Sequence, residues 1–512
     1  MVILAACGGS GGDDDAPGDG GNTDAPPLPP ARCVAPIELV DTSSPTTVVG
    51  DGTPASCTAA ALATAVAQGG IITFDCGAAE HTITVTAPLA APTGTDTTID
   101  GGGSIVLSGG NTSRILELVH SFEKASPTLT VQRIALRDGR TTDVPNTTET
   151  DQGGAAIFTL GGNIHAIDAT FTDNHGPDTG QDVAGGAIYS VGAGEVTVVR
   201  SVFAGNSCSN GGAVSVLGSG LAIVDSVLDG NAATGNNGNP GNGGNGGAST
   251  MDGRGQPLTL CGATFTNNTA NAFGGAIFRT SYENEPTTID QSVFDGNQTP
   301  DGDIGQAGAV YLQGTAIAMT NTSITNNRSR FAAAMSVYEH GAPAPGVIDM
   351  TNVTIANNLV WEQDPFTETG LVGGINVGDR VTGSWVNVTL VGNKAQFASG
   401  IGGASARLTI RNTIIANDWL NDFTPLNCNG EPAAGEANLQ WPENNQSNND
   451  VACVANITHA DPLMGALDAD THTRAPQSGS PAIGLGVNCP ATDQLGNPRP
   501  ASGCTAGAIE VP

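Results

Sequence analysis

Basic residues are scarce in this chain. Of its 512 residues only 17 are Lys or Arg, against 49 Asp or Glu, so the formal net charge is −32. Nucleic acids and anionic membrane surfaces attract proteins through basic patches, and we therefore expect neither as a partner. Cations, Ca²⁺ included, are compatible with this charge.

Long apolar runs and aromatic residues are also lacking. No run of about 18 apolar residues occurs, so we expect no membrane-spanning helix. Aromatic residues make up only 4% of the chain, while 72 residues are Gly. A fold of long helices is disfavoured by so much Gly, and the core must be built largely from small side chains.

The ten cysteines form no C-x-x-C pair, so the usual signature of zinc sites and thioredoxin-like motifs is missing. Spaced cysteines in a loop-rich sequence suit disulfides made in an oxidising compartment. Three pairs are predicted: Cys57 with Cys76, Cys428 with Cys453, and Cys489 with Cys504. Three cysteines are left over, each expected to be a buried or unpaired thiol: Cys33, Cys208 and Cys261.

The first residues resemble a lipoprotein export signal. Leu4-Ala5-Ala6-Cys7 resembles a bacterial lipobox, in which the Cys is lipidated and becomes the mature N-terminus. Residues 1–7 lack a positive region and have only a short apolar one, so we expect the true start further upstream. Residues 8–35 are rich in Gly, Asp and Pro and predict a disordered tether. The resemblance implies export and lipid anchoring at the outer membrane or cell surface.

The body of the chain repeats. One recurring element is an apolar residue, two small or polar residues and Asn, ending at Asn174, Asn206, Asn231, Asn268, Asn297, Asn327, Asn358 and Asn393, with a variant last copy at Asp418. A pair of small residues followed by Ala or Ile precedes each copy by 18 to 25 positions, whereas 5 to 15 positions separate each Asn from the next pair. Each repeat therefore has an arc of nearly constant length and a corner where loops enter.

Short alternating runs within the arc, such as 187–191 and 195–199, predict strands separated by Gly-rich turns. Strands stacked without helices predict an all-β solenoid. One internal apolar column is expected at Phe171, Phe203, Leu228, Phe265, Phe294, Ile324, Ile355, Leu390 and Ile415. The Asn residues would form a hydrogen-bonded ladder at a turn. A second polar column is expected to face solvent: Asp168, Asp225, Asn321, Asn352 and Asn387.

The recurring Phe-x-x-Asn and Gly-Gly-Ala-Ile pattern over 125–420 resembles the right-handed parallel β-helix repeats of bacterial surface proteins and pectin-lyase-like proteins. The resemblance implies a right-handed solenoid of about 10–13 coils. Residues 36–124 would hold an N-terminal cap and the first coils, with Thr58 capping a helix over 59–68. A β-propeller is the alternative, although its units are longer and richer in Trp.

The C-terminal region, 421–512, carries a second resemblance. Its motifs include Asp461-Pro462-Leu463, Gly479-Ser480-Pro481-Ala482-Ile483 and Gly507-Ala508-Ile509-Glu510. They resemble the choice-of-anchor Q domain that closes many bacterial β-helix surface proteins, over about 455–512. Gly484, Leu495 and Ala506 depart from the residues more common in that family. The resemblance implies a C-terminal cap and a surface setting.

Glycan cleavage is the catalytic alternative, because β-helices of the pectin-lyase type often perform it. Lyases of that type use acidic Ca²⁺ ligands and a basic residue near the sugar. Asp173, Asp178, Asp182 and Arg200 could form such a set. Solvated loop aspartates are the simpler interpretation in so acidic a chain, so we predict no catalytic residue and no required cofactor, with Ca²⁺ as an optional ion.

Four loops enter at the same corner of the repeat and predict one raised ridge: 175–184, 232–245, 298–306 and 359–372. Trp361, Asp364 and Phe366 combine aromatic rings with a carboxylate on this ridge, which suits a glycan. We expect a monomeric, non-catalytic, lipid-anchored surface β-helix for structural display, adhesion, or glycan or partner binding. A Ca²⁺-dependent polysaccharide lyase or other glycan-active enzyme is the alternative.

Overall fold

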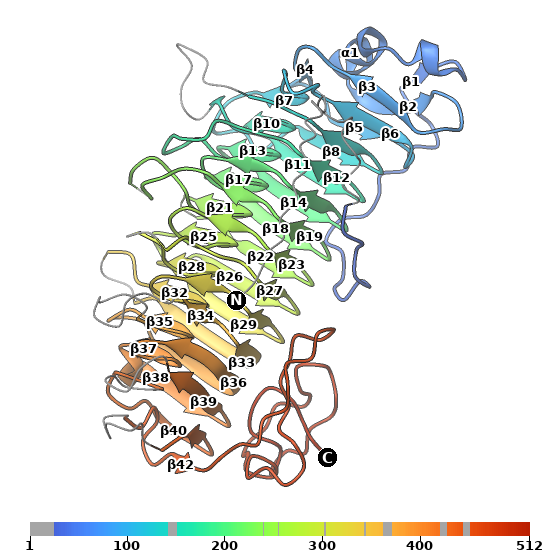
Figure 1. Cartoon of the computed structure of the whole chain (residues 1–512). Coiled ribbons are helices and arrows are strands. Elements are labelled where there is room, and N and C mark those ends of the chain that lie inside the picture. The colour runs from blue at the N-terminus through green and yellow to red at the C-terminus, as the bar shows by residue number, and fades with distance from the viewer. Residues whose placement is uncertain are drawn as a thin grey trace, which may run out of the picture.

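The chain folds into a right-handed parallel β-helix from β1 (Thr47–Gly50) to β42 (Thr458–His459), as the repeats and their family resemblance together predicted (Figure 1). The computed structural model describes residues 25–141, 151–238, 240–253, 255–301, 304–341, 345–361, 371–419, 427–443 and 451–512. Within these segments, no helix combines the length and apolar character needed to cross a membrane.

Each full coil places one strand on each of three faces, and every strand pairs in parallel with its equivalents in the neighbouring coils. Face A is a single 11-stranded sheet. Its strands are β4 (Leu89–Ala90), β7 (Leu116–Val119), β10 (Ile157–Leu160), β13 (Ile188–Val191), β17 (Val214–Leu217), β21 (Ser249–Asp252), β25 (Ile277–Thr280), β28 (Val310–Gln313), β32 (Met335–Tyr338), β35 (Ile375–Val377) and β37 (Ile401–Gly403).

Faces B and C meet at a bend and together form the 28-stranded sheet, along with the short strands β31 (Arg328–Ser329) and β34 (Leu359–Val360). Face B consists of β1, β2 (Gly70–Asp75), β5 (Thr97–Asp100), β8 (Thr128–Gln132), β11 (Asn163–Ile167), β14 (Glu195–Val199), β18 (Gly220–Val224), β22 (Leu258–Cys261), β26 (Pro286–Asp290), β29 (Ala316–Thr320), β38 (Leu408–Arg411) and β40 (Ala434–Glu436). Face C consists of β3 (His81–Thr84), β6 (Ile105–Ser108), β9 (Ala135–Arg137), β12 (Thr170–Thr172), β15 (Val202–Ala204), β19 (Val227–Asp229), β23 (Thr264–Thr266), β27 (Val293–Asp295), β30 (Ser323–Thr325), β39 (Ile414–Trp419), β41 (Leu439–Trp441) and β42. Two long strands, β33 (Val347–Ala356) and β36 (Gly383–Ala395), span both faces. A separate three-stranded sheet follows face C: β16 (Ser207–Cys208), β20 (Ala232–Ala233) and β24 (Thr269–Ala270).

The predicted apolar column runs along the inside of face C. Phe171 pairs in register with Phe203, and Phe265 with Phe294. The two ring pairs stack with centroids 4.5 and 4.9 Å apart. All nine predicted members of the column are fully buried, so the periodic pattern identified the core correctly.

The predicted Asn ladder is also present, at the turn that follows face C. Each Asn donates its Nδ2 to the Oδ1 of the Asn one coil further on, for example Asn206 to Asn231 at 2.9 Å. The ladder ends differently from the prediction: Asn393 donates to Asn417, not to Asp418, and Asn417 donates onward to Asn427. The register between β36 and β39 shifts after Val391, which moves the ladder position back by one residue.

A short helical cap closes the N-terminal end. In α1 (Ala59–Gln68), Leu62, Ala65 and Val66 are buried, and the Thr58 hydroxyl accepts a hydrogen bond from the Ala61 N–H at 3.2 Å. Two 3₁₀ turns, Pro54–Ser56 and Ser405–Arg407, are also present. Cys57 and Cys76 are joined, and the other two predicted disulfides, Cys428–Cys453 and Cys489–Cys504, are present as well.

Residues 25–46 form a strap along the bend between faces B and C, so the prediction of a disordered tether over 8–35 is wrong for 25–35. Residues 8–24 and Cys7 lie outside the described residues. The strap is fastened by a fourth disulfide, Cys33–Cys261, which corrects the prediction that both cysteines would be unpaired. The two positions are 228 residues apart, and spacing gives no sign of a pair made by a segment that folds back along the coils. Cys208 is unpaired and buried, as expected.

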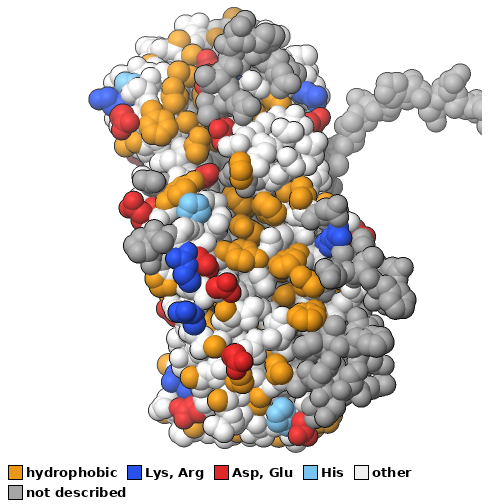
Figure 2. Space-filling model, turned by 90° about the vertical axis from the view of Figure 1, so that its left-hand side faces the viewer, with side chains coloured by type: hydrophobic (Ala, Val, Ile, Leu, Met, Phe, Trp, Pro, Cys, Tyr) orange, Lys and Arg blue, Asp and Glu red, His pale blue; other side chains and the backbone are white. Residues whose placement is uncertain are grey.

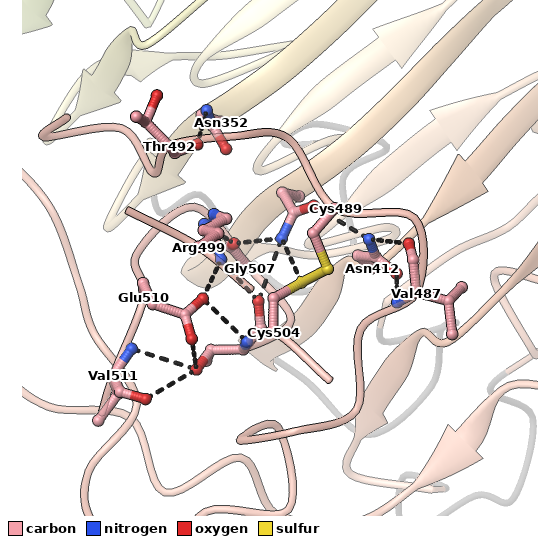
Figure 3. Close-up of a disulfide and its surroundings, with 12 residues drawn as sticks. Asn352, Asn412, Val487, Cys489, Thr492, Arg499, Cys504, Gly507, Glu510 and Val511 are labelled. Atoms are coloured by element: carbon pink, nitrogen blue, oxygen red, sulfur yellow. Dashed lines mark hydrogen bonds and ion pairs between the residues drawn. A yellow bond between two sulfur atoms is a disulfide. The ribbon is translucent and has the colours of Figure 1, made fainter. Parts of the chain in front are cut away.

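The described residues of the C-terminal region do not cover the end of the solenoid. Strands β40 to β42 continue the coils as far as His459, and residues 461–512 then lie along the flank beside β33, β36 and β39 (Figure 1). Asn412 exchanges two hydrogen bonds with Val487, and the Cys489–Cys504 disulfide lies beside this contact (Figure 3). The predicted C-terminal cap over 421–512 is therefore a further pair of coils followed by a flanking segment.

The second polar column lies at the bend between faces B and C, and its residues have left-handed backbones with φ from 46° to 56°. The prediction that it faces solvent is wrong for Asp225, Asn352 and Asn387, which are 3%, 3% and 0% exposed. The strap covers Asp225, whose Oδ1 accepts a hydrogen bond from the Arg32 N–H at 2.8 Å. The C-terminal segment covers the two asparagines, which donate to the carbonyls of Thr492 and Thr505.

Candidate binding sites

The residues of the predicted lyase set lie at different corners of the coil. Arg200 lies at the bend between β14 and β15, where its Nε donates to Asp168 Oδ1 at 2.7 Å and its Nη2 donates to Asp168 Oδ2 at 3.1 Å. Asp173 follows β12, while Asp178 and Asp182 lie in the loop that leads to β13. Arg200 is thus engaged in a two-pronged ion pair at another bend and does not face the three aspartates.

The aspartates differ in their surroundings: Asp173 is half-buried, whereas Asp178 is exposed. Burial raises the pKa of Asp173, and burial also lowers the pKa of the neighbouring His175. The backbone carbonyl of Asp182 accepts a hydrogen bond from the Tyr189 hydroxyl at 2.9 Å. Among the described residues, no three His, Cys, Asp or Glu side chains come together as a metal site would require.

Loops of the predicted ridge meet in pairs. The Gly180 N–H donates to the Asn242 carbonyl at 3.3 Å, and the Thr234 hydroxyl donates to the Asp178 carbonyl at 3.1 Å. These contacts join loops 175–184 and 232–245 across the intervening coil. Loop residues from different coils are therefore side by side, as their common position in the repeat predicted.

Trp361 joins the other two loops, because its Nε1 donates to the Thr299 carbonyl at 2.7 Å. The guanidinium of Arg328 lies 5.1 Å from the Trp361 ring centroid and covers part of the ring. Trp361 is half-buried and holds the ridge together, which leaves little of its face for a ligand. Asp364 and Phe366, the other predicted ridge residues, lie outside the described part of the chain.

The outer surface of face A carries an aromatic row that the repeats did not predict. Phe158 and Tyr189 occupy adjacent coils, and Phe278 and Tyr311 form a second pair with centroids 5.2 Å apart. Hydrophobic side chains gather on this side of the molecule (Figure 2). The four rings are nevertheless 2–9% exposed, because the flanking loops cover them. Burial, together with the nearby charge of Asp182, raises the pKa of Tyr189 well above its usual value. We interpret this row as packing between the sheet and its loops.

Two larger cavities lie where the C-terminal segment meets the flank. The first, of about 430 Å³, is lined mainly by hydroxyl and amide groups, including those of Asn321, Thr471, Thr492 and Gln494, with Arg32 of the strap beside them. The Gln494 side chain in this cavity is engaged with the coils: it accepts a hydrogen bond from the Thr354 hydroxyl at 2.6 Å and donates one to the Ser323 hydroxyl at 2.7 Å. We interpret this cavity as the junction of the two flanking segments.

The second cavity, of about 460 Å³, has a different composition. Trp441, at the end of β41, lines it with 40% of its surface exposed. Asp461, Met464 and Arg474 of the C-terminal segment also line it, as do Gly392 and Asn417 of the coils. An exposed aromatic ring in one cavity with a carboxylate and a guanidinium is a typical lining for a small-molecule site.

The orientation of Arg474 in this cavity is fixed by the coils. Its Nε donates to the Gly465 carbonyl at 2.9 Å, and its Nη1 donates to Asn357 Oδ1 at 3.2 Å. A Cβ on Gly392 would lie 2.5 Å from Nη1, so a larger residue there would require the guanidinium to shift. Asp461 is exposed and accepts one hydrogen bond, from the Leu463 N–H to Oδ1 at 2.9 Å.

Sequence reasoning missed Trp441 and Arg474 because their place in one cavity depends on how the C-terminal segment docks on the flank. The Trp-Pro step just after the last repeats was the only local signal. Comparison of the chain with family models, with curated proteins and with solved structures found no match in any of the three.

Proposed function

We propose that this protein is an exported, lipid-anchored, non-catalytic β-helix that displays binding surfaces at the bacterial cell envelope. The observation that carries the proposal is the uninterrupted Asn ladder from Asn174 to Asn427, in which every amide bonds to the next coil. Such a ladder resists sliding and bending of the coils, because any displacement breaks buried hydrogen bonds that no water can replace. A long, rigid body of this kind suits display or adhesion.

Four disulfides support export, since such bonds persist in oxidising compartments. The lipobox-like segment ending at Cys7 supports the lipid anchor, at the outer membrane or cell surface. The lyase alternative receives no support, because its basic residue is paired with Asp168 away from the candidate aspartates.

Two experiments test the proposal. Mass spectrometry of protein made from the full-length gene should find an acyl group on Cys7, and Cys7→Ser should release the protein from the membrane fraction. A mature chain that starts well downstream of Cys7 would refute the anchor. The purified protein should release no unsaturated product from polygalacturonate, alginate or xylan, with or without Ca²⁺. Product formation that is lost in Arg200→Gln would establish the lyase instead.

A further inference from the structure

We infer that the cavity between Trp441 and the C-terminal segment binds a neutral pyranose unit of a glycan. The inference deepens the proposed function, because it gives the display scaffold a ligand class and a place to bind it. It depends on three features of the cavity: an exposed indole ring, two planar polar groups and a fixed shape.

The indole ring provides the apolar platform. Among the three Trp side chains that the structure describes, only Trp441 is exposed. Trp385 is fully buried, and Trp361 is half-buried beneath Arg328. The C–H groups of a pyranose ring form a flat apolar face, which packs on an aromatic ring and removes both surfaces from water. Met464 adds apolar surface to the same cavity.

Asp461 and Arg474 provide the polar side. A carboxylate accepts hydrogen bonds from vicinal hydroxyls, and a guanidinium presents N–H groups in a planar fork. Both groups line the same cavity as Trp441, so a ring packed on the indole would have a carboxylate and a guanidinium within the same cavity for its hydroxyl groups. This combination of apolar surface and polar groups matches the two kinds of surface that a sugar ring presents.

The charge of the site selects a neutral sugar. The carboxylate of Asp461 offsets the charge of Arg474 within the cavity, and the chain as a whole carries −32, so the site offers no net attraction to a uronate or sulfated unit. A phosphorylated ligand is disfavoured on the same ground. The volume of about 460 Å³ lies within the range of ordinary ligand pockets and suits one or two sugar units.

The shape of the site is set before binding. Arg474 is oriented by Gly465 and Asn357, and Gly392 leaves the space that it occupies. Pro462 is buried beneath the wall that carries Asp461. Little conformational freedom therefore has to be lost when the ligand binds, which favours measurable affinity from few contacts.

The test uses isothermal titration calorimetry of the full chain with neutral tetrasaccharides of β-1,4-glucan, β-1,4-mannan, β-1,4-xylan and β-1,3-glucan, and with tetragalacturonate. At least one neutral tetrasaccharide should bind with a dissociation constant of roughly 1 mM or tighter, and tetragalacturonate should bind more weakly. Trp441→Ala should weaken binding by about tenfold or more, because the platform is lost. Asp461→Asn, which keeps the oxygen that accepts from Leu463, should weaken it roughly threefold to tenfold.

Two further variants separate the site from general effects. Phe122→Ala removes an aromatic ring that is 50% exposed on a distant loop, and it should bind like the unmodified protein. Trp441→Phe keeps a platform without the indole, so it should bind within a few-fold of the unmodified protein but lose the ligand-induced change in fluorescence. Circular dichroism melting of each variant checks that it is folded.

The outcomes distinguish this inference from the proposed function. A neutral tetrasaccharide that binds Trp441→Ala as tightly as the unmodified protein would overturn the site while leaving a glycan-binding scaffold in place. Tighter binding of tetragalacturonate would overturn the choice of a neutral sugar. Absence of binding by all five tetrasaccharides would overturn the inference, whereas the display scaffold is judged by its own anchor and lyase tests.

Discussion

Asn268 accepts two hydrogen bonds from Asn231, one from the backbone N–H at 2.9 Å and one from Nδ2 at 3.0 Å. It donates its own Nδ2 to the Leu228 carbonyl and to Asn297 Oδ1, each at 2.9 Å. One side chain without solvent exposure therefore satisfies polar groups in three consecutive coils. The solenoid depends on such asparagines because each repeats the same bonds at one turn.

Asn268→Ala should lower the free energy of unfolding by about 2–5 kcal/mol, because it leaves buried donors and an acceptor without partners. Urea denaturation followed by circular dichroism measures the loss. Asn271→Ala, three residues away on the exposed surface, should change stability by less than about 1 kcal/mol. Equal effects of the two substitutions would contradict the structural role of the ladder.

Phe294→Ala should lower the free energy of unfolding by about 3–5 kcal/mol, since it opens a cavity in the stacked column inside face C. The matched control is Phe122→Ala, which removes the same side chain from a half-exposed position. In chemical denaturation, the midpoint should fall strongly for Phe294→Ala and only slightly for Phe122→Ala. A small shift for Phe294→Ala would mean that the core can close around the missing ring.

The environment of Glu285 predicts that the protein loses stability as the pH falls. Burial alone would raise its pKa, but hydrogen bonds from Ser281 and from the N–H groups of Gly255 and Glu283 outweigh burial and lower the pKa to about 2. Because the folded-state pKa lies below the unfolded value of 4.5, the stabilisation is complete above pH 4.5 and is lost as the pH falls towards 2. The shift corresponds to stabilisation on the order of 3 kcal/mol.

Glu285→Gln should accordingly destabilise the protein at pH 7, because an amide nitrogen cannot accept the bonds that the second carboxylate oxygen accepts. The difference in melting temperature between the variant and the unmodified protein should narrow as the pH falls from 4.5 to 2. Scanning calorimetry over this range measures it. A difference that stays constant would show that the Glu285 charge makes no contribution.

Release of the strap is the expected result of removing the Cys33–Cys261 disulfide. Cys33→Ser with Cys261→Ser should destabilise the protein by about 2–4 kcal/mol. Limited proteolysis followed by mass spectrometry should then find faster cleavage within residues 25–46 than in the unmodified protein. Cys208→Ala, at the unpaired buried cysteine, should leave the strap protected. If the strap resists cleavage equally well in the double variant, its polar contacts are enough to hold it on the solenoid.

The parts of the fold that repeat could be predicted from the sequence, and the parts that occur once could not. Phe203 and Asn206 recur at fixed spacing, so their shared column and turn follow directly from the period. β36 holds one extra residue after Val391 relative to β39, so the ladder partner of Asn393 is Asn417, where the repeat predicted Asp418. Such an irregularity leaves no trace in the spacing of a single repeat, so it could not be predicted.

The flank was mispredicted for a related reason. Asn387 looks like a solvent-facing turn residue within its own repeat, and its burial comes from residues 117 to 120 positions further along the chain. The pocket around Trp441 has the same origin, since the C-terminal segment forms one of its walls. Contacts made by segments that lie outside the period leave no periodic signal.

The bond between Cys33 and Cys261 also determines how the molecule would carry tension. A pull on the N-terminal end reaches Cys33 before it reaches β1, and the disulfide passes it directly to β22, near the middle of the solenoid. The cap at α1 and the coils before β22 therefore lie outside the path of the force. A molecule held by its N-terminal end would be loaded from the middle of its length, and the half that precedes Cys261 would project as an unloaded arm.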